Sequence, residues 1–216
     1  EVEPLAPGSD EWRVKATGYY THVQDYIDAQ RCNFGQCGGA ANVSATTGFV
    51  NLQYVNQSAR LYGVDLSGSM QLGRSGDFGS FKGSGLLSYV RGKNTTTGGN
   101  LYNIMPLNAK VAVTQSLGGW SNTAEVQLVG AKLDVSQVRN EVPTTGYGLL
   151  NLRSSYEWKQ FRLDFGIENV LNRLYAMPLG GAYLGQGASM TSKGIPWGVV
   201  VPGMGRSFNL ALTVRI

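Results

Sequence analysis

The sequence predicts an all-β fold, the wall of a transmembrane antiparallel β-barrel with about eight strands in this chain. Two observations carry this prediction. Apolar and polar residues alternate in many segments, and no helical period competes with that alternation. Short and long connections also alternate along the chain, which is typical of outer-membrane barrels.

The first three expected strands, residues 12–28, 49–72 and 80–91, each carry a stripe of alternate apolar side chains. The stripes contain, in chain order, Trp12, Val14, Ala16 and Tyr20; Tyr62, Val64, Leu66, Met70 and Leu72; and Phe81, Leu87 and Tyr89. Successive side chains of a strand point to opposite faces, so each stripe defines one face of a sheet.

The next four expected strands form two hairpins. Residues 106–117 and 120–134 are joined by two glycines, and residues 147–158 and 161–171 are joined by Lys159 and Gln160. Connections of two residues are typical of tight antiparallel turns.

The last expected strand, residues 206–216, has the clearest alternation. Its apolar set is Phe208, Leu210, Leu212, Val214 and Ile216, and polar or small residues lie between them. Such a strand could border a soluble core or separate lipid from a water-filled lumen. Its length favours the membrane, because a tilted strand crosses the hydrocarbon in about 9–11 residues.

The connections after the second, fourth and sixth strands are short, whereas the others are long and rich in Gly, Asn and Thr. This sorting predicts periplasmic turns at one end and extracellular loops at the other. Aromatic residues support two interfacial girdles. The expected girdle on the turn side is Trp12, Trp120, Trp158 and Phe161, and that on the loop side is Tyr26, Tyr89, Tyr147 and Tyr175.

Composition excludes several classes of protein. The 216 residues include 30 glycines, only 15% are charged, and the formal charge of +4 is spread along the chain, which argues against a nucleic-acid partner. No apolar stretch is long enough for a transmembrane helix. The chain opens on EVEPLAPGSDE without a leader pattern, so we expect either a removed signal or a piece of a longer protein.

Two cysteines, Cys32 and Cys37, lie close together among Gly and Asn residues. A disulfide that closes a small surface loop is the main interpretation, because an extracytoplasmic setting permits it. A soft-metal pair is the alternative, although the second ligand pair of such motifs is missing.

No catalytic constellation is visible, and we expect no enzyme. His22, the single histidine, lies in a strand pattern and is interpreted as a lumen or surface residue. Charged residues such as Arg153, Asp164 and Glu168 are expected to line the lumen with hydrogen bonds and ion pairs.

Residues 166–181, GIENVLNRLYAMPLGG, resemble the end of TonB-dependent outer-membrane receptors. The matching signature is Asn169, Val170, Leu171, Asn172 and Tyr175, and a second match enters the final strand at Gly205, Arg206, Ser207 and Phe208. A third is the segment around Ala59–Asp65, which looks like a family strand that follows a long loop. One difference is that family members usually end on Phe or Trp, and this sequence ends on Ile216.

The resemblance implies that residues 1–216 are the C-terminal segment of a 22-stranded barrel, without its plug domain and TonB box. It also implies an integral protein of the Gram-negative outer membrane, in contact with outer-membrane lipid including lipopolysaccharide. The implied function is uptake of a small-molecule or metal ligand, most often an iron chelate or siderophore, energised by the TonB complex. We expect no cofactor.

The long loop from Ala176 to Gly205 is the best candidate for ligand binding. Its aromatic and thioether side chains are Met177, Tyr183, Met190, Trp197 and Met204. Loops of this composition can gather ligand, although packing at the barrel mouth would explain them too. Three methionines also suggest copper as a possible ligand, because thioethers suit Cu(I).

Two alternatives remain open at this point. A self-contained eight-stranded outer-membrane barrel could have a structural, adhesion or lipid-active role, since an even strand number permits closure. A soluble all-β domain is the third possibility. Pairing between the first and last strands would distinguish the small barrel from a receptor segment.

Overall fold

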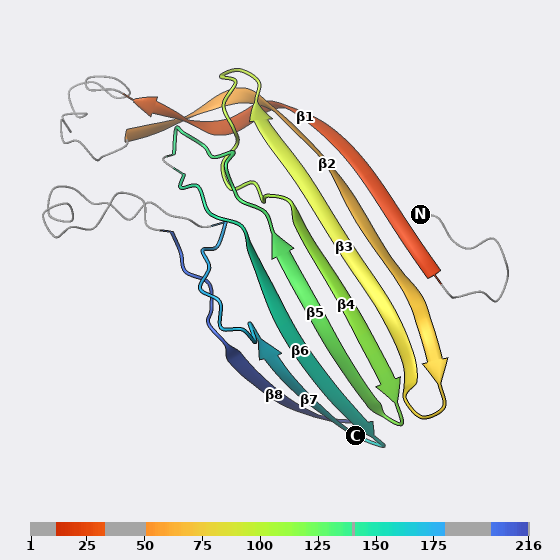
Figure 1. The fold of residues 1–216 in the computed structure, drawn as a ribbon. Coiled ribbons are helices and arrows are strands. Elements are labelled where there is room, and N and C mark those ends of the chain that lie inside the picture. Colours follow the sequence, from red (N-terminus) through yellow and green to blue (C-terminus); the bar gives the residue numbers. More distant parts are fainter. Residues whose placement is uncertain (1–11, 33–50, 140, 180–199, 216) are drawn as a thin grey trace, which may run out of the picture.

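The computed structural model describes residues 12–32, 51–139, 141–179 and 200–215, and these form one antiparallel sheet in chain order (Figure 1). Its strands are β1 Trp12–Cys32, β2 Asn51–Ser75, β3 Gly79–Asn94, β4 Asn108–Leu117, β5 Trp120–Val129, β6 Tyr147–Trp158, β7 Phe161–Glu168 and β8 Ser207–Val214. Among these residues, no helix has the length and apolarity to cross a membrane. The all-β prediction is confirmed.

Most predicted strand ends agree with the structure to within three residues, and the largest differences, at the ends of β1 and β5, lie where long connections begin. β1 contains a bulge between Val23 and Tyr26, where Asp25 has a φ of 56°. The strand then pairs with β2 again and continues beyond residue 28. β5 ends at Val129 because the chain then leaves the sheet, and Lys132 pairs with Thr144 instead. β7 ends at Glu168 because Asn169 adopts a φ of 50°.

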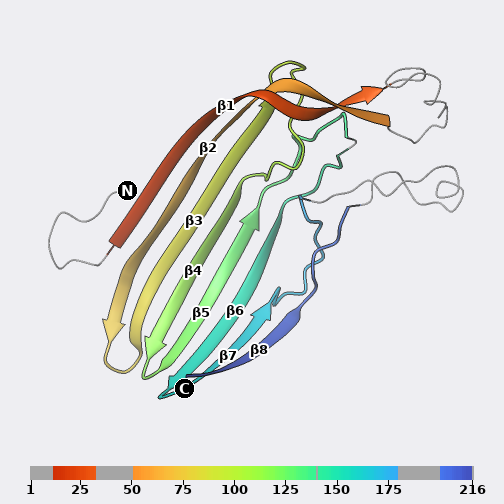
Figure 2. The same ribbon diagram turned by 180° about the vertical axis from the view of Figure 1, so that it is seen from behind.

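The short turns between β2 and β3, β4 and β5, and β6 and β7 lie together at one end of the sheet (Figures 1 and 2). Gly118 and Gly119, which join β4 to β5, have φ values of 53° and 89°. Two successive positive φ angles are the requirement of a tight hairpin turn, and glycine meets it without strain. The predicted sorting of short turns and long loops is therefore confirmed.

The sheet is open. β1 and β8 are its two edges, and they neither pair nor touch in the described structure. A closed barrel of these eight strands would need that pairing. The alternative of a self-contained eight-stranded barrel is therefore wrong for the described strands, which form a curved section of wall.

Cross-strand register separates the two faces of the wall. One, here called the apolar face, carries side chains that are at least 36% exposed: Val14, Leu66, Leu87, Val111, Val126, Leu152, Leu163 and Leu212. The other, the polar face, carries Lys15, Asp65, Ser84, Lys110, Glu125, Arg153, Asp164 and Asn209. An apolar surface extending over all eight strands is far larger than a soluble monomer exposes, which indicates contact with lipid.

The girdle prediction is confirmed at the turn end, and at the loop end it is confirmed for Tyr89 alone among the four predicted tyrosines. Trp12, Trp120, Trp158 and Phe161 are between 43% and 55% exposed, and all lie on the apolar face. At the loop end, Tyr147 pairs with Val129 on the polar face, and the ring of Tyr175 packs against that of Tyr147 at a tilt of 37°, with 4.4 Å between the centroids.

Tyr26 is opposite Gln57, also on the polar face, because the bulge shifts its register. The loop-side edge of the apolar face is occupied by Tyr89, as predicted, together with Tyr20 and Tyr62.

Three polar side chains interrupt the apolar face near the turn end. Ser154 Oγ donates to Asn122 Oδ1 at 2.6 Å, and Asn122 Nδ2 donates to Gln115 Oε1 at 3.3 Å. Gln115 Nε2 donates in turn to the carbonyl of Phe78 at 3.0 Å. Because each group has a partner within the wall, the chain avoids the cost of an unsatisfied polar group in hydrocarbon.

We predict that a charge on the apolar face destabilises the complete protein in a lipid bilayer. Val113 lies midway along the apolar stripe of β4 and is 41% exposed. Val113→Arg should lower the free energy of unfolding by about 2–4 kcal/mol, because the guanidinium would enter the hydrocarbon midplane. Denaturant titration in bilayers measures this. Ala112→Arg, on the polar face opposite Glu125, is the matched control, and equal losses would contradict the assignment of faces.

Candidate functional site: the loop-bearing end of the wall

The candidate site is the end of the wall that carries the long connections, beside the projecting ends of β1 and β2 (Figure 1). Its described residues are 95–107, 130–139, 141–146, 169–179 and 200–206. The described residues with the lowest exposure gather here. Ala59 is 0% exposed, Leu101 1%, Lys132 2% and Val135 4%. An open sheet has no core between two layers, so packing among the connections supplies the buried contacts of this end.

Asn94, the last residue of β3, joins β3 to β1 and β2. Its Nδ2 donates to Asp28 Oδ2 at 2.9 Å and also to Gln57 Oε1. Its Oδ1 accepts from the backbone N–H groups of Thr96 and Thr97, both at 3.0 Å. The side chain therefore satisfies the backbone at the point where the β ladder stops.

Arg139 attaches the β5–β6 connection to the same place. Its Nη2 lies 3.6 Å from Asp28 Oδ1, and its Cζ lies 5.4 Å from the Tyr54 ring centroid and 5.1 Å from that of Tyr102. Arg31 Nη2 adds a hydrogen bond to the carbonyl of Gln137 at 2.9 Å. A guanidinium held between two rings and a carboxylate is a favourable arrangement for a partly exposed cation.

A buried ion pair connects three loops. Lys132 Nζ binds Glu141 Oε1, and the two side chains are only 2% and 3% exposed. Lys132 Nζ also donates to the carbonyl of Pro178 at 3.0 Å. Glu141 accepts from the N–H of Asn103 at 3.0 Å and from that of Ser136 at 2.7 Å. These extra hydrogen bonds offset the desolvation of the buried charges.

The signature at residues 169–175 forms the turn that leaves β7. Asn169 and Asn172 have φ values of 50° and 51°, a conformation that asparagine tolerates better than most residues. Asn169 Nδ2 donates to the carbonyls of Arg173 at 2.8 Å and Met204 at 3.1 Å. Asn172 Oδ1 accepts from the N–H of Arg206 at 3.0 Å, so both asparagines join the start of the loop to its return into β8.

Charged side chains on the polar face continue to this turn. Arg153 Nη2 lies 3.3 Å from Glu125 Oε1 and 3.0 Å from Glu168 Oε1. Asn151 Nδ2 donates to Glu125 at 3.0 Å, and Asn151 Oδ1 accepts from the N–H of Asn169, also at 3.0 Å. The predicted lining of hydrogen bonds and ion pairs is thus present on β5, β6 and β7.

Two of the five predicted ligand-binding residues lie in the described structure. Met177 is 43% exposed and Met204 is 69% exposed. Their segments pair through a bridge between Ala176 and Pro202, and this register places the two methionines on opposite faces of a short ribbon. The structure does not bring them together. Tyr183, Met190 and Trp197 lie outside the described residues.

Only one of the two cysteines in the predicted disulfide lies within the described residues. Cys32 is 7% exposed at the end of β1, and Cys37 lies outside the described residues, so the disulfide stays a prediction. Within the described residues, no group of three or more His, Cys, Asp or Glu side chains could hold a metal ion. His22 is exposed on β1, opposite Arg60.

Sequence reasoning missed the residues that organise this end, namely Asn94, Arg139, Lys132 and Glu141. Their partners are far away in sequence, and Asp28 and Asn94 are 66 residues apart. One local signal existed, since the run Asn-Thr-Thr-Thr-Gly-Gly at residues 94–99 favours an Asx turn. The Lys132–Glu141 pair had no comparable signal.

Comparison with known proteins gives consistent results at three levels. Residues 6–170 match the family model described as TonB dependent receptor-like, beta-barrel. The heme/hemopexin utilization protein C of Haemophilus influenzae (strain ATCC 51907 / DSM 11121 / KW20 / Rd) is 29% identical over 189 residues, which cover 80% of this chain and 25% of that protein. The chain thus spans about a quarter of the length of that curated relative.

Two solved structures illustrate the likeness of fold. The copper transporter OprC superposes with a TM-score of 0.75 and 25% identity, over 96% of this chain and 29% of that chain. The ferric yersiniabactin uptake receptor FyuA of Yersinia pestis superposes with a TM-score of 0.62 and 14% identity, over 95% of this chain and 28% of that chain.

We predict that Lys132→Met loosens the loop end, because it leaves Glu141 as an unpaired buried charge. Breaking such a pair typically costs about 3–5 kcal/mol. Hydrogen exchange in the complete protein should therefore accelerate at the amides of Asn103 and Ser136 but not within β4 and β5. Lys132→Met with Glu141→Gln should restore part of the protection, because the neutral amide removes the buried charge and keeps one carbonyl oxygen as an acceptor for these amides.

The control for that experiment is Arg162→Gln, which breaks an exposed ion pair with Asp164 on the polar face of β7. Exposed pairs contribute little, so exchange at the loop end should not change. Unaltered exchange in Lys132→Met would contradict the proposed role of the buried pair.

We also predict that Asn169→Ala destabilises the turn after β7 more than Asn169→Gly does. Both variants lose the same hydrogen bonds, but alanine at a φ of 50° carries an additional cost of about 1–2 kcal/mol. Denaturant titration of the complete protein measures the difference. Leu171→Ala, at a 69% exposed position, should have little effect, and equal stability of the Ala and Gly variants would contradict the argument.

Proposed function

The chain belongs to the TonB-dependent receptor family of β-barrels, and from this premise we propose that it is the C-terminal part of an outer-membrane receptor. The receptor takes up a scarce ligand into a Gram-negative bacterium, with energy supplied by the TonB complex. The plug and the TonB contact belong to the remainder of the receptor. The protein performs no covalent chemistry.

The observation that carries this proposal is the family match over residues 6–170. The two faces of the wall support it, because an apolar face for lipid and a polar face for a lumen are what a spanning barrel requires. The loop end supports it too. Hydrogen bonds and an ion pair hold the connections after β3, β5 and β7 together near the sheet. The loops that would contact a ligand therefore extend from a fixed base.

An iron chelate is the proposed ligand class, either haem or a ferric siderophore. The support is the name of the sequence relative, a heme/hemopexin utilization protein, and that of the ferric receptor FyuA with a similar fold. A plugged barrel does not allow free diffusion, so transport of such a ligand needs a rearrangement in the lumen. The ligand can drive that rearrangement only if it binds the two conformations with different affinity.

Copper is the second candidate, and two observations favour it. The copper transporter OprC has a TM-score of 0.75 with this chain, and Met177, Met190 and Met204 could offer thioethers to Cu(I). Against it, the register near Ala176 and Pro202 separates Met177 from Met204. We therefore rank an iron chelate above copper.

Uptake by the complete receptor tests the proposal. Cells that lack the receptor gene, with and without a plasmid copy, receive radiolabelled iron as haem or as ferric siderophores, or radiolabelled copper. We expect accumulation of one iron chelate at least tenfold above the strain without the plasmid, and its loss in a strain that lacks TonB. Accumulation of copper alone would contradict the iron proposal, and accumulation that persists without TonB would contradict the mechanism.

A triple variant, Met177→Leu with Met190→Leu and Met204→Leu, separates the two ligands. Leucine keeps the volume and removes the thioether sulfur. Uptake of the iron chelate should be unchanged, whereas loss of copper uptake would support the second candidate.

A further inference from the structure

A groove of about 500 Å³ crosses the polar face of the wall from β1 to β4. Its floor consists of two glycines and four residues with short side chains, namely Ser67, Ser69, Ser84 and Ala112. Its sides carry the long cationic side chains of Arg13, Lys15 and Lys110. A molecule in the groove would therefore meet hydroxyl groups beneath it and positive charge on both sides.

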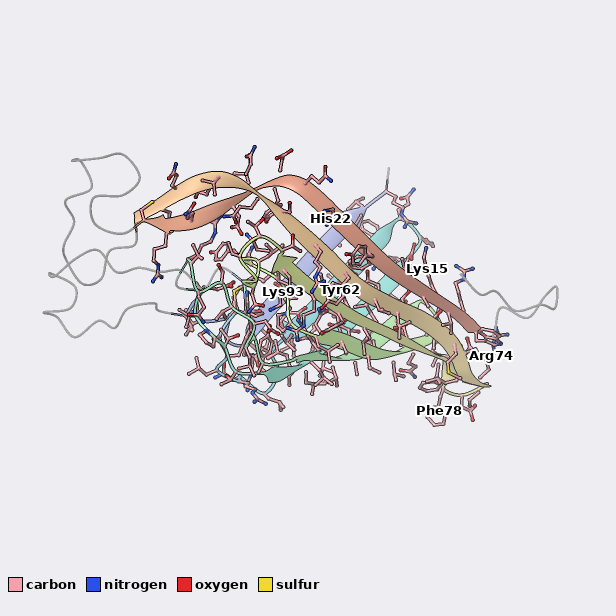
Figure 3. The ribbon with its side chains drawn as sticks, turned by 90° about the horizontal axis from the view of Figure 1, so that it is seen from above. Lys15, His22, Tyr62, Arg74, Phe78 and Lys93 are labelled. Atoms are coloured by element: carbon pink, nitrogen blue, oxygen red, sulfur yellow. The ribbon has the colours of Figure 1, made fainter. Side chains whose placement is uncertain are left out.

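One end of the groove lies at the turn end of the wall. Arg13 is the second residue of β1, next to the girdle residue Trp12, and Lys15 follows on the same face. In Figure 3, Lys15 lies on the side of Arg74, near the β2–β3 turn, and away from Lys93 at the loop end. Two cations are therefore close to the short turns.

The other end of the groove lies at a different depth. Lys110 is the third residue of β4, a strand that begins at the loop end. The row of cross-strand partners that joins the two ends is Lys15, Ser67, Leu86 and Lys110. Strands of a membrane barrel tilt by about 35–45°, so such a row crosses the membrane obliquely. The groove therefore presents cations at successive depths between the loops and the turns.

The groove has an excess of positive charge. β2, β3 and β4 contain one acidic residue, Asp65, which already accepts a hydrogen bond from β3. Glu125 lines the groove at its far side but is bound by Arg153. Arg13 and Lys110 belong to no ion pair among the described residues.

The other half of the polar face is balanced. Each of the four acidic residues of β5 to β8 forms an ion pair with an arginine of the same part of the wall. The pairs are Glu125 and Glu168 with Arg153, Asp164 with Arg162, and Glu157 with Arg215. A cleft lined by charge of one sign concentrates ions of the opposite sign. The unbalanced half is therefore suited to an anion that does not belong to the wall.

We propose that the groove binds the anionic groups of the transported iron chelate as it passes from the loops to the periplasm. Lys110 binds such a group first and Arg13 binds it last, and the serine hydroxyls hydrogen-bond the chelate between them. A site on a pathway speeds passage when it binds strongly enough to admit the ligand and weakly enough to release it. The inference rests on the proposed transport function, and it adds that the chelate is an anion.

Ala112 offers a test that leaves every cation in place. Ala112→Glu adds a negative charge to the floor, and Ala112→Gln adds a side chain of similar size without charge. Cells with the complete receptor receive radiolabelled iron as haem or ferric citrate, which are anionic, or as ferrichrome, which is uncharged. The maximal uptake rate of an anionic probe should be about fivefold lower with Ala112→Glu than with Ala112→Gln. Binding to the cell surface in a strain that lacks TonB should be equal in the two variants.

Removal of the cations gives an independent test. Arg13→Gln with Lys110→Gln should lower the maximal uptake rate of the anionic probe by about fivefold. Arg13→Lys with Lys110→Arg keeps both charges and should restore most of the rate. The matched control, Arg162→Gln with Arg215→Gln, removes two charges from the balanced half and should keep the wild-type rate.

Three results would overturn the groove site. One is an equal loss of uptake in both Ala112 variants, because obstruction and not charge would then explain it. Another is an equal loss in the Arg162 and Arg215 control. The third is lower thermal stability of the purified complete receptor with Arg13→Gln and Lys110→Gln than with the control substitutions, because the groove would then hold a resident part of the receptor.

Failure of the groove site can be distinguished from failure of the proposed function. Anionic chelate that enters at the same rate with Ala112→Glu and Ala112→Gln would overturn the groove site alone. Accumulation of ferrichrome but of neither anionic chelate would also overturn the groove site and leave iron transport intact. Accumulation of no iron chelate by the wild type would overturn both.

Discussion

The need to pair every backbone N–H and C=O group governs this structure. In hydrocarbon no water replaces a missing hydrogen bond, so the eight strands pair continuously from β1 to β8 wherever one face is apolar. The same pairing fixes the faces, because a slip of one residue would bring Lys110 or Glu125 into lipid. The bulge after Val23 is consistent with this, since it lies beyond Tyr20, where water can satisfy the backbone again.

Above that boundary, side chains take over the hydrogen bonds of the ladder. Asn94 satisfies two backbone N–H groups at the end of β3, and Asn169 satisfies backbone groups of Arg173 and Met204 after β7. Glu141 does the same for Asn103 and Ser136. The bases of the loops are therefore fixed by specific long-range contacts.

The features that could be predicted from the sequence lie on the membrane side of this boundary, and those that could not lie on its loop side. Within the membrane band, one period of two residues determines each strand, so the faces of β4 to β8 could be predicted from alternation alone. Beyond it, no period constrains the chain. Tyr26, Tyr147 and Tyr175 were expected in a girdle but belong to the polar face or the mouth, because a bulge or a turn changes which face they meet. The contact of Arg139 with Tyr54 and Tyr102 depends on loops that meet only in three dimensions.

The signature around Asn169 lies at the point where the paired membrane strand ends and the loop begins. This position gives a physical reason for its residue types. Glu125, Arg153 and Glu168 form ion pairs on the polar face, and Asn151 carries that network to the backbone of Asn169. Asn169 and Asn172 then supply both the positive φ of the turn and the hydrogen bonds to the returning strand. Glycine would offer the conformation without the bonds, and glutamine the bonds without the conformation. At position 169 asparagine combines them, because its amide both donates and accepts there, so this residue marks the place where a membrane strand becomes a fixed loop.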